Sequence, residues 1–156
     1  MSATLAPFDV RPLATRLQSL VPSLRQVGLA ADLAAFQALG DFPAPCAYVL
    51  LAGERGQAST PAGYRPRNMQ VSRQQSLTVT FGVALVIRNY RMQAGAPVAG
   101  DLPLLGDVRA ALLGFVPDCA GAVPCTLQRG DLIRYDAGVA MWLDNWQTQH
   151  TIGVSA

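Results

Sequence analysis

Residues with side chains suited to chemistry are few and scattered in this chain. His150 is the only histidine and Glu54 the only glutamate among 156 residues. A general base must lie within hydrogen-bond reach of its partners. His150 falls near the end of the last expected strand, and Glu54 falls in a stretch rich in Gly and Pro, a poor place for a buried acid–base pair. We therefore expect a surface or capped histidine rather than a catalytic base.

The remaining candidates for chemistry have simpler structural explanations. No Gly-X-Ser-X-Gly elbow occurs, and the absence of Lys removes a Walker A phosphate loop. Asp131, Asp136 and Asp144 could meet across a terminal hairpin as a cation site, but such positions are more typical of turns and solvent faces. Trp142 and Trp146 could stack a ligand, although core or subunit packing is favoured. The prediction is a protein that is not an enzyme, with no cofactor and no metal.

The three cysteines, Cys46, Cys119 and Cys125, show no Cys-X-X-Cys spacing and no nearby His. A zinc site is therefore not expected. An odd number of cysteines fits a reducing compartment. Cys119 and Cys125 are close enough in sequence to bridge, and the sequence leaves that pairing open.

Composition points to contacts between subunits. Hydrophobic residues make up 51% of the chain and charged residues 14%, against about 25% charged in an ordinary soluble domain. The apolar surplus must be buried, and subunit interfaces are one place for it. All 12 cationic side chains are Arg, and the net charge of +2 is too small to indicate nucleic acid binding. Without a signal peptide or an apolar run of about 18 residues, we expect one domain over residues 1–156, made in the host cytoplasm, with no membrane partner.

The chain is organised around residues 71–90. From Leu77 to Ile87 every odd position is large and apolar, which predicts a central strand with one face on a core. Helices are expected over residues 8–21, 32–39 and 102–114, and further strands over residues 24–29, 46–52, 126–135 and 139–151. The fold class predicted is α+β: a single mostly antiparallel (mixed) sheet, two to three helices packed on one face, and a long projecting loop or hairpin arm.

That arm, residues 53–70, is the least core-like part of the chain. Long irregular segments in compact domains are uncommon and usually functional. Arg and Tyr are also enriched at protein contacts, although a disordered surface loop is the simpler alternative. The residues predicted to contact another subunit or another protein are Arg55, Tyr64, Arg65, Arg67, Met69 and Arg73.

An ordered set of segments carries a family resemblance. These are VPSLRQVGLAADLAAF with FPAPCAYVLLAGERG, then TVTFGVALVIRNYR with DVRAALLGFVP, and finally LIRYDAGVAMWLDNWQTQ. Together they resemble the tail terminator proteins of long-tailed bacteriophages, including Mu-like prophage tail proteins. The resemblance covers about residues 8–150. Its motifs are hydrophobic and turn patterns, and they define no catalytic residues.

The resemblance implies a structural virion protein. Such a protein forms a homo-oligomeric ring, expected to be a hexamer, that caps the head-proximal end of the tail tube and stops its polymerisation. Its partners would be its own copies, the major tail tube protein and the head–tail connector or neck protein, with DNA only passing through the lumen. The alternatives are a neck or connector adaptor, a tail tube subunit, or a small ligand-binding or enzymatic α+β domain.

Overall fold

The computed structural model describes residues 3–34, 36–58, 73–88, 91–93, 96–99 and 102–154. Its helices are α1 (Arg11–Leu20), α2 (Ala30–Leu33), α3 (Leu102–Leu112) and the short 3-10 helix η1 (Leu39–Asp41). Its strands are β1 (Ala3–Thr4), β2 (Gln26–Leu29), β3 (Cys46–Gly56), β4 (Arg73–Ile87), β5 (Arg91–Gln93), β6 (Ala96–Ala99), β7 (Thr126–Asp136) and β8 (Val139–Val154).

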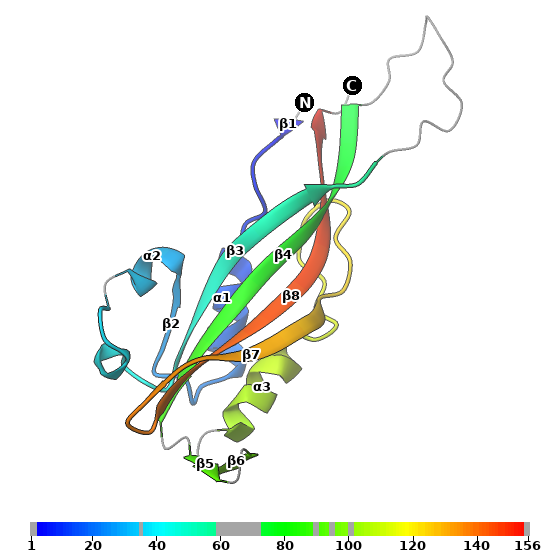
Figure 1. The fold of residues 1–156 in the computed structure, drawn as a ribbon. Helices are drawn as coiled ribbons and strands as arrows, with labels where there is room; N and C mark the ends of the chain where they lie inside the picture. The colour runs from blue at the N-terminus through cyan, green and yellow to red at the C-terminus, as the bar shows by residue number, and fades with distance from the viewer. Residues whose placement is uncertain are drawn as a thin grey trace, which may run out of the picture.

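β4 is the central strand, as the alternation of its residues predicts. It pairs antiparallel with β8 from Arg73 to Ile87 on one side and with β3 on the other. Six of the described strands form one sheet in the order β1-β8-β4-β3-β2, with β7 also paired to β8, and β5 and β6 form a separate two-stranded sheet (Figure 1). Because β2 and β3 run parallel and the other pairs antiparallel, the predicted α+β class with a mostly antiparallel mixed sheet is confirmed.

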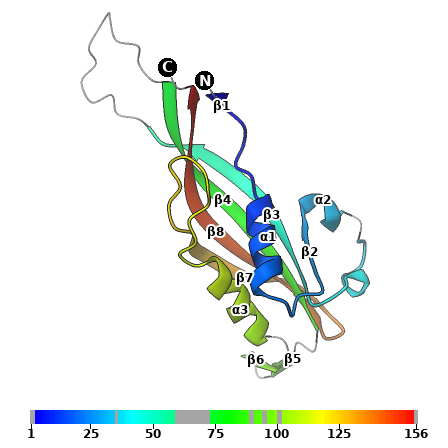
Figure 2. The same cartoon turned by 180° about the vertical axis from the view of Figure 1, so that it is seen from behind.

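One face of this sheet carries the main core. The odd positions of β4 point to it, and Phe81 is fully buried there. α1 contributes Leu13 and Leu17, and α3 contributes Val108 and Leu112. Figure 2 shows these two helices lying side by side across the back of the long strands. Two of the expected helices therefore pack on one face.

The opposite face is also covered at one end, although the sequence pattern predicts helices on one face only. There the even positions of β4 are apolar, and Ala84 and Val86 are buried. η1 and the residues after it pack on them through Leu39 and Phe42, together with Tyr48 of β3. Apolar residues on both faces of β4 require cover on both sides, so α2 and η1 lie across the sheet from α1 and α3.

The terminal hairpin of β7 and β8 turns where the sequence predicts it. Ala137 and Gly138 both adopt positive φ, 48° and 83°. A two-residue turn with both central residues left-handed matches the twist of the flanking strands. β7 is irregular, because its pairing with β8 skips one residue between Leu127 and Arg129 and another between Leu132 and Arg134.

β3 is longer than predicted, and this moves the start of the arm. The strand continues to Gly56, and the Gln57 amide donates to Ser76 of β4 at 2.9 Å. Residues 53–56 are thus sheet rather than loop. A β-bulge interrupts the β3–β4 register between Leu51 and Gly53. Residues 59–70 of the predicted arm lie outside the described part of the chain.

Candidate functional site

Three segments distant in sequence meet at one end of the sheet. β1 pairs Ala3 with Val154 of β8, and the first residue of β4, Arg73, pairs with the same Val154. Figure 1 shows both termini and the outer end of the β3–β4 hairpin at this end. We call it the hairpin end. It lies away from the turn between β7 and β8, and it is where the predicted arm leaves and rejoins the sheet.

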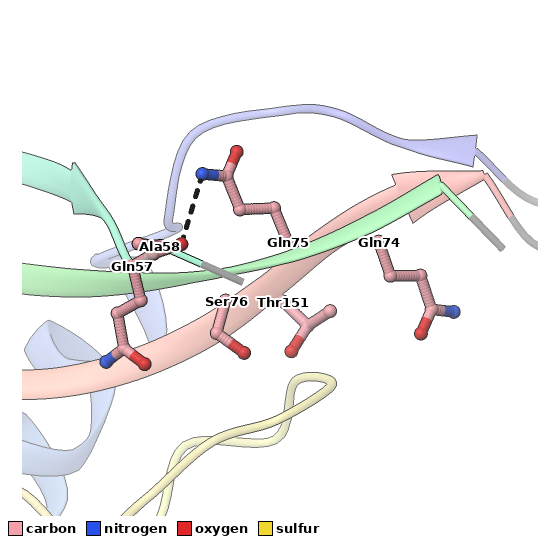
Figure 3. Close-up of a pocket in the computed structure, with 6 residues that line it drawn as sticks. All are labelled: Gln57, Ala58, Gln74, Gln75, Ser76 and Thr151. Atoms are coloured by element: carbon pink, nitrogen blue, oxygen red, sulfur yellow. Dashed lines mark hydrogen bonds between the residues drawn. The ribbon is translucent and has the colours of Figure 1, made fainter. Parts of the chain in front are cut away.

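A shallow polar cavity of about 250 Å³ lies at the hairpin end (Figure 3). The Gln75 side-chain amide donates to the Gln57 carbonyl at 3.4 Å, and the Gln57 side-chain amide donates to Thr78 Oγ1 at 3.0 Å. Amides and hydroxyls both donate and accept hydrogen bonds without charge. The cavity therefore suits neutral polar groups, such as those of another protein's backbone. Its lining residues are Gln57, Ala58, Gln74, Gln75, Ser76 and Thr151.

Two of the predicted interface residues fall near this cavity. Arg55 is exposed on β3 opposite Thr78, and Arg73 begins β4. The structure brings both to the hairpin end. The other four predicted contacts lie outside the described residues: Tyr64, Arg65, Arg67 and Met69.

Glu54 and His150 form a partly buried pair, contrary to the sequence-based expectation. Their side chains meet at 2.7 Å between Glu54 Oε1 and His150 Nε2, and His150 is only 4% exposed. The bulge after Leu51 is the reason. It places Glu54 opposite Val79, on the face covered by α1 and α3, whereas uninterrupted alternation would have put it on the other face. Of the two expected alternatives, a surface or a capped histidine, the surface histidine was therefore wrong.

The same carboxylate holds the N-terminal segment. The Phe8 backbone amide donates to Glu54 Oε1 at 2.7 Å, and the Phe8 ring packs edge-on against His150 with 5.6 Å between centroids. Phe8 also stacks on Phe81 at 6.4 Å, and Phe81 stacks on Trp146 at 6.3 Å. Trp146 is thus a core residue, as favoured from the sequence. The Glu54–His150 pair and the Phe8 ring together hold the N-terminal segment against the sheet.

The three aspartates considered as a cation site do not come together. Asp144 is 1% exposed and accepts two hydrogen bonds of 2.8 Å from Arg109 on α3, and a third of 2.8 Å from Trp142 Nε1. The hydrogen bond to this carboxylate raises the pKa of Arg109. Asp131 pairs instead with Arg129 at 2.6 Å. Among the described residues no group of three potential ligands is positioned to hold a metal ion.

Gly130 makes room for the Arg109–Asp144 contact. It lies on β7 directly opposite Asp144. A Cβ on Gly130 would lie 2.5 Å from Asp144 Oδ1, 2.6 Å from an Arg109 nitrogen and 3.0 Å from Trp142 Nε1. The ion pair therefore fixes α3 to β8 through a gap that only glycine leaves open.

A second opening, of about 480 Å³, lies between the N-terminal segment and the loop after α3. Phe8 and His150 line it from one side, and Asp118 and Cys119 from the other. Cys119 is exposed, and all three cysteines are free thiols. Burial raises the pKa of the Cys119 thiol, with a further contribution from Asp118.

These observations define an α+β protein in which two polar pairs, Glu54–His150 and Arg109–Asp144, hold elements of the fold together. A protein-family model described as phage tail terminator protein matches residues 3–156, nearly the whole chain. The chain therefore belongs to the phage tail terminator family, and the family resemblance seen in the sequence is confirmed. No match was found among curated proteins.

Family membership makes this a structural phage tail protein and a component of the virion. The family is one of structural tail proteins and is not a known enzyme family, and membership implies association with other tail and neck proteins. None of the described helices is long and apolar enough to cross a membrane.

Proposed function

We propose that this chain is a single-domain, ring-forming tail terminator. Six copies close a ring on the head-proximal end of the tail tube, stop its polymerisation and present the surface that joins the tail to the head–neck connector. The observation that carries the proposal is the family match over residues 3–156. The partners are other copies of the chain, the major tail tube protein and the connector, with DNA passing through the lumen.

A physical argument supports a dedicated terminator. A tube of rings stacked head to tail is an open assembly, since each added ring recreates the face that binds the next. Growth ends only when a bound protein fails to reproduce that face. Within the ring itself, each subunit must use two different patches, one for each neighbour, because a cyclic ring of more than two subunits closes through heterologous contacts.

The hairpin end is the surface we assign to these contacts. It carries exposed Arg55 and the uncharged amides and hydroxyls of the polar cavity. Arg forks bind carboxylates in two-point geometry, and neutral amides bind backbone groups. The contact residues proposed are Arg55, Tyr64, Arg65, Arg67, Met69 and Arg73.

Deletion of the gene from the phage or prophage tests the proposal. Cells should then accumulate overlong tubes, or tails that do not join heads, and a plasmid copy of the wild-type gene should restore tails of normal length. Tails of normal length attached to heads in the deletion strain would overturn the proposal.

Electron microscopy of the purified protein distinguishes a tail terminator from a tail tube subunit. A terminator stops at single rings. A tail tube subunit polymerises into tubes by itself, so long tubes of the pure protein would assign the chain to the tube instead.

A further inference from the structure

β7 forms a long open edge of the sheet. It is 11 residues long, and within the described part of the chain it pairs with β8 alone. Ile133, in its second half, is 54% exposed. An open edge presents unpaired N–H and C=O groups to another strand, and native sheets blunt such edges with charges and bulges, both of which β7 carries.

Charges of alternating sign follow this edge on one face. They lie opposite residues of β8 whose side chains point away from α1 and α3, since Leu143, Met141 and Val139 pack in the second core cluster. The skipped residue, Ile133, keeps the charges after it on the same face as those before it. In chain order the row is Arg129, Asp131, Arg134 and Asp136.

This row is complementary to itself when two copies of β7 run antiparallel. Arg129 then lies opposite the second copy's Asp136, and Asp131 lies opposite the second copy's Arg134. Every charge meets its opposite on the same face of a continuous sheet. Shifting the register by two residues in either direction places Arg129 against Arg134 or Asp131 against Asp136. Like charges directly opposite are destabilising, so one register is selected.

We propose that β7 is a docking edge for β7 of a second copy, forming a two-fold dimer of the free chain. Main-chain hydrogen bonds supply the affinity of such strand addition, and the charges fix its register. Arg129 and Asp131 already pair within one chain at 2.6 Å, so the second copy's Asp136 and Arg134 extend that pair into a row. Isolated exposed ion pairs contribute little, whereas a row contributes more.

The dimer goes beyond the proposed function. A two-fold contact uses the same patch on both subunits and closes with two of them, so it differs from the contacts that build a ring. It covers the unpaired backbone groups of this edge while the protein waits for a tube end. We expect a dissociation constant in the micromolar range, because the dimer must give way to assembly.

Sedimentation velocity of the full-length protein in reducing buffer tests this, over a concentration series without tube protein. The wild type should shift from monomer to dimer, and added salt should weaken the dimer. Arg134→Asp places two carboxylates opposite each other twice per dimer and should weaken it about tenfold or more. The double variant Asp131→Arg/Arg134→Asp restores opposite signs and should restore the dimer. Asp107→Arg, an exposed change on α3, is the matched control and should leave dimerisation unchanged.

Three sedimentation results would overturn the assignment: a wild type that stays monomeric, an Arg134→Asp variant that dimerises normally, or a double variant as weak as the single one. Melting curves confirm that each variant is folded. Ring formation on tube ends is scored separately, and Arg134→Asp should retain it. Loss of rings in that variant would place β7 in the ring contact and overturn the two-fold assignment without touching the terminator proposal.

Discussion

Glu54 and His150 lie 2.7 Å apart, Oε1 to Nε2, although 96 residues separate them in the chain. They reach across β4, since Glu54 lies opposite Val79 and His150 opposite Leu77. The same Glu54 oxygen accepts the Phe8 amide. One carboxylate therefore joins β3, β8 and the N-terminal segment.

Replacing this carboxylate should loosen all three elements. Glu54→Ala leaves the Phe8 amide and the His150 ring without their acceptor and should lower the free energy of unfolding by about 1–3 kcal/mol. Glu54→Gln keeps an acceptor oxygen and should cost less. Urea denaturation of both variants measures the difference, and Asp107→Ala serves as an exposed control expected within about 0.5 kcal/mol of wild type. If Glu54→Ala and His150→Ala give strictly additive losses in the double variant, the two side chains are not coupled as described.

Two glycines should respond in opposite ways to the same substitution. Gly130→Ala drives a methyl group into the Arg109–Asp144 pair and should destabilise the protein by about 1–3 kcal/mol. Gly106 lies in α3, and no heavy atom is within 4 Å of an added Cβ. Gly106→Ala should therefore stabilise the protein by about 0.5–1 kcal/mol, because Gly loses more backbone entropy than Ala in a helix. Thermal melts of the two variants provide the comparison. Equal effects of the same sign would contradict the close approach at Gly130.

Alkaline pH should lower the stability of the fold through its buried thiols. Burial raises the pKa of Cys125 from 9.0 to about 11, and of Cys46 to about 11. A raised pKa in the folded state means that the unfolded chain loses its proton first. Stability from these thiols is therefore complete below pH 9 and is lost as the pH rises from about 9 to about 11. The free energy of unfolding should fall less steeply over this range in Cys125→Ala than in wild type, and identical slopes would contradict the assignment.

Shortening the arm should separate folding from function. Removing residues 60–70 leaves β3 through Gly56 and β4 from Arg73 intact, so the protein should fold and melt near the wild-type temperature. It also removes Tyr64, Arg65, Arg67 and Met69 from the proposed interface. Cells carrying it should accumulate overlong or headless tails. If tails of normal length join heads, the arm is only a loop and the interface assignment is wrong.

Local patterns in the sequence predict the central strand and the final hairpin of the fold. The alternation from Leu77 to Ile87 predicts the central strand, and the turn at residues 136–138 predicts the final hairpin. The Glu54–His150 contact could not be predicted, because a single bulged residue after Leu51 turns Glu54 to the other face. Nothing in the local sequence marks where a register will slip. The Arg109–Asp144 pair could not be predicted from the local sequence either, because it depends on how α3 packs on β8.

Assembly of tail tubes in vitro tests the central claim most directly. Purified major tail tube protein is polymerised alone and with increasing amounts of this chain, and tube lengths are measured by electron microscopy. We expect shorter tubes in proportion to the amount added, each ended on one side by a single ring of this protein, and the variant lacking residues 60–70 should have no effect. Tube lengths that do not change, with no density of this protein at either end, would contradict a terminator.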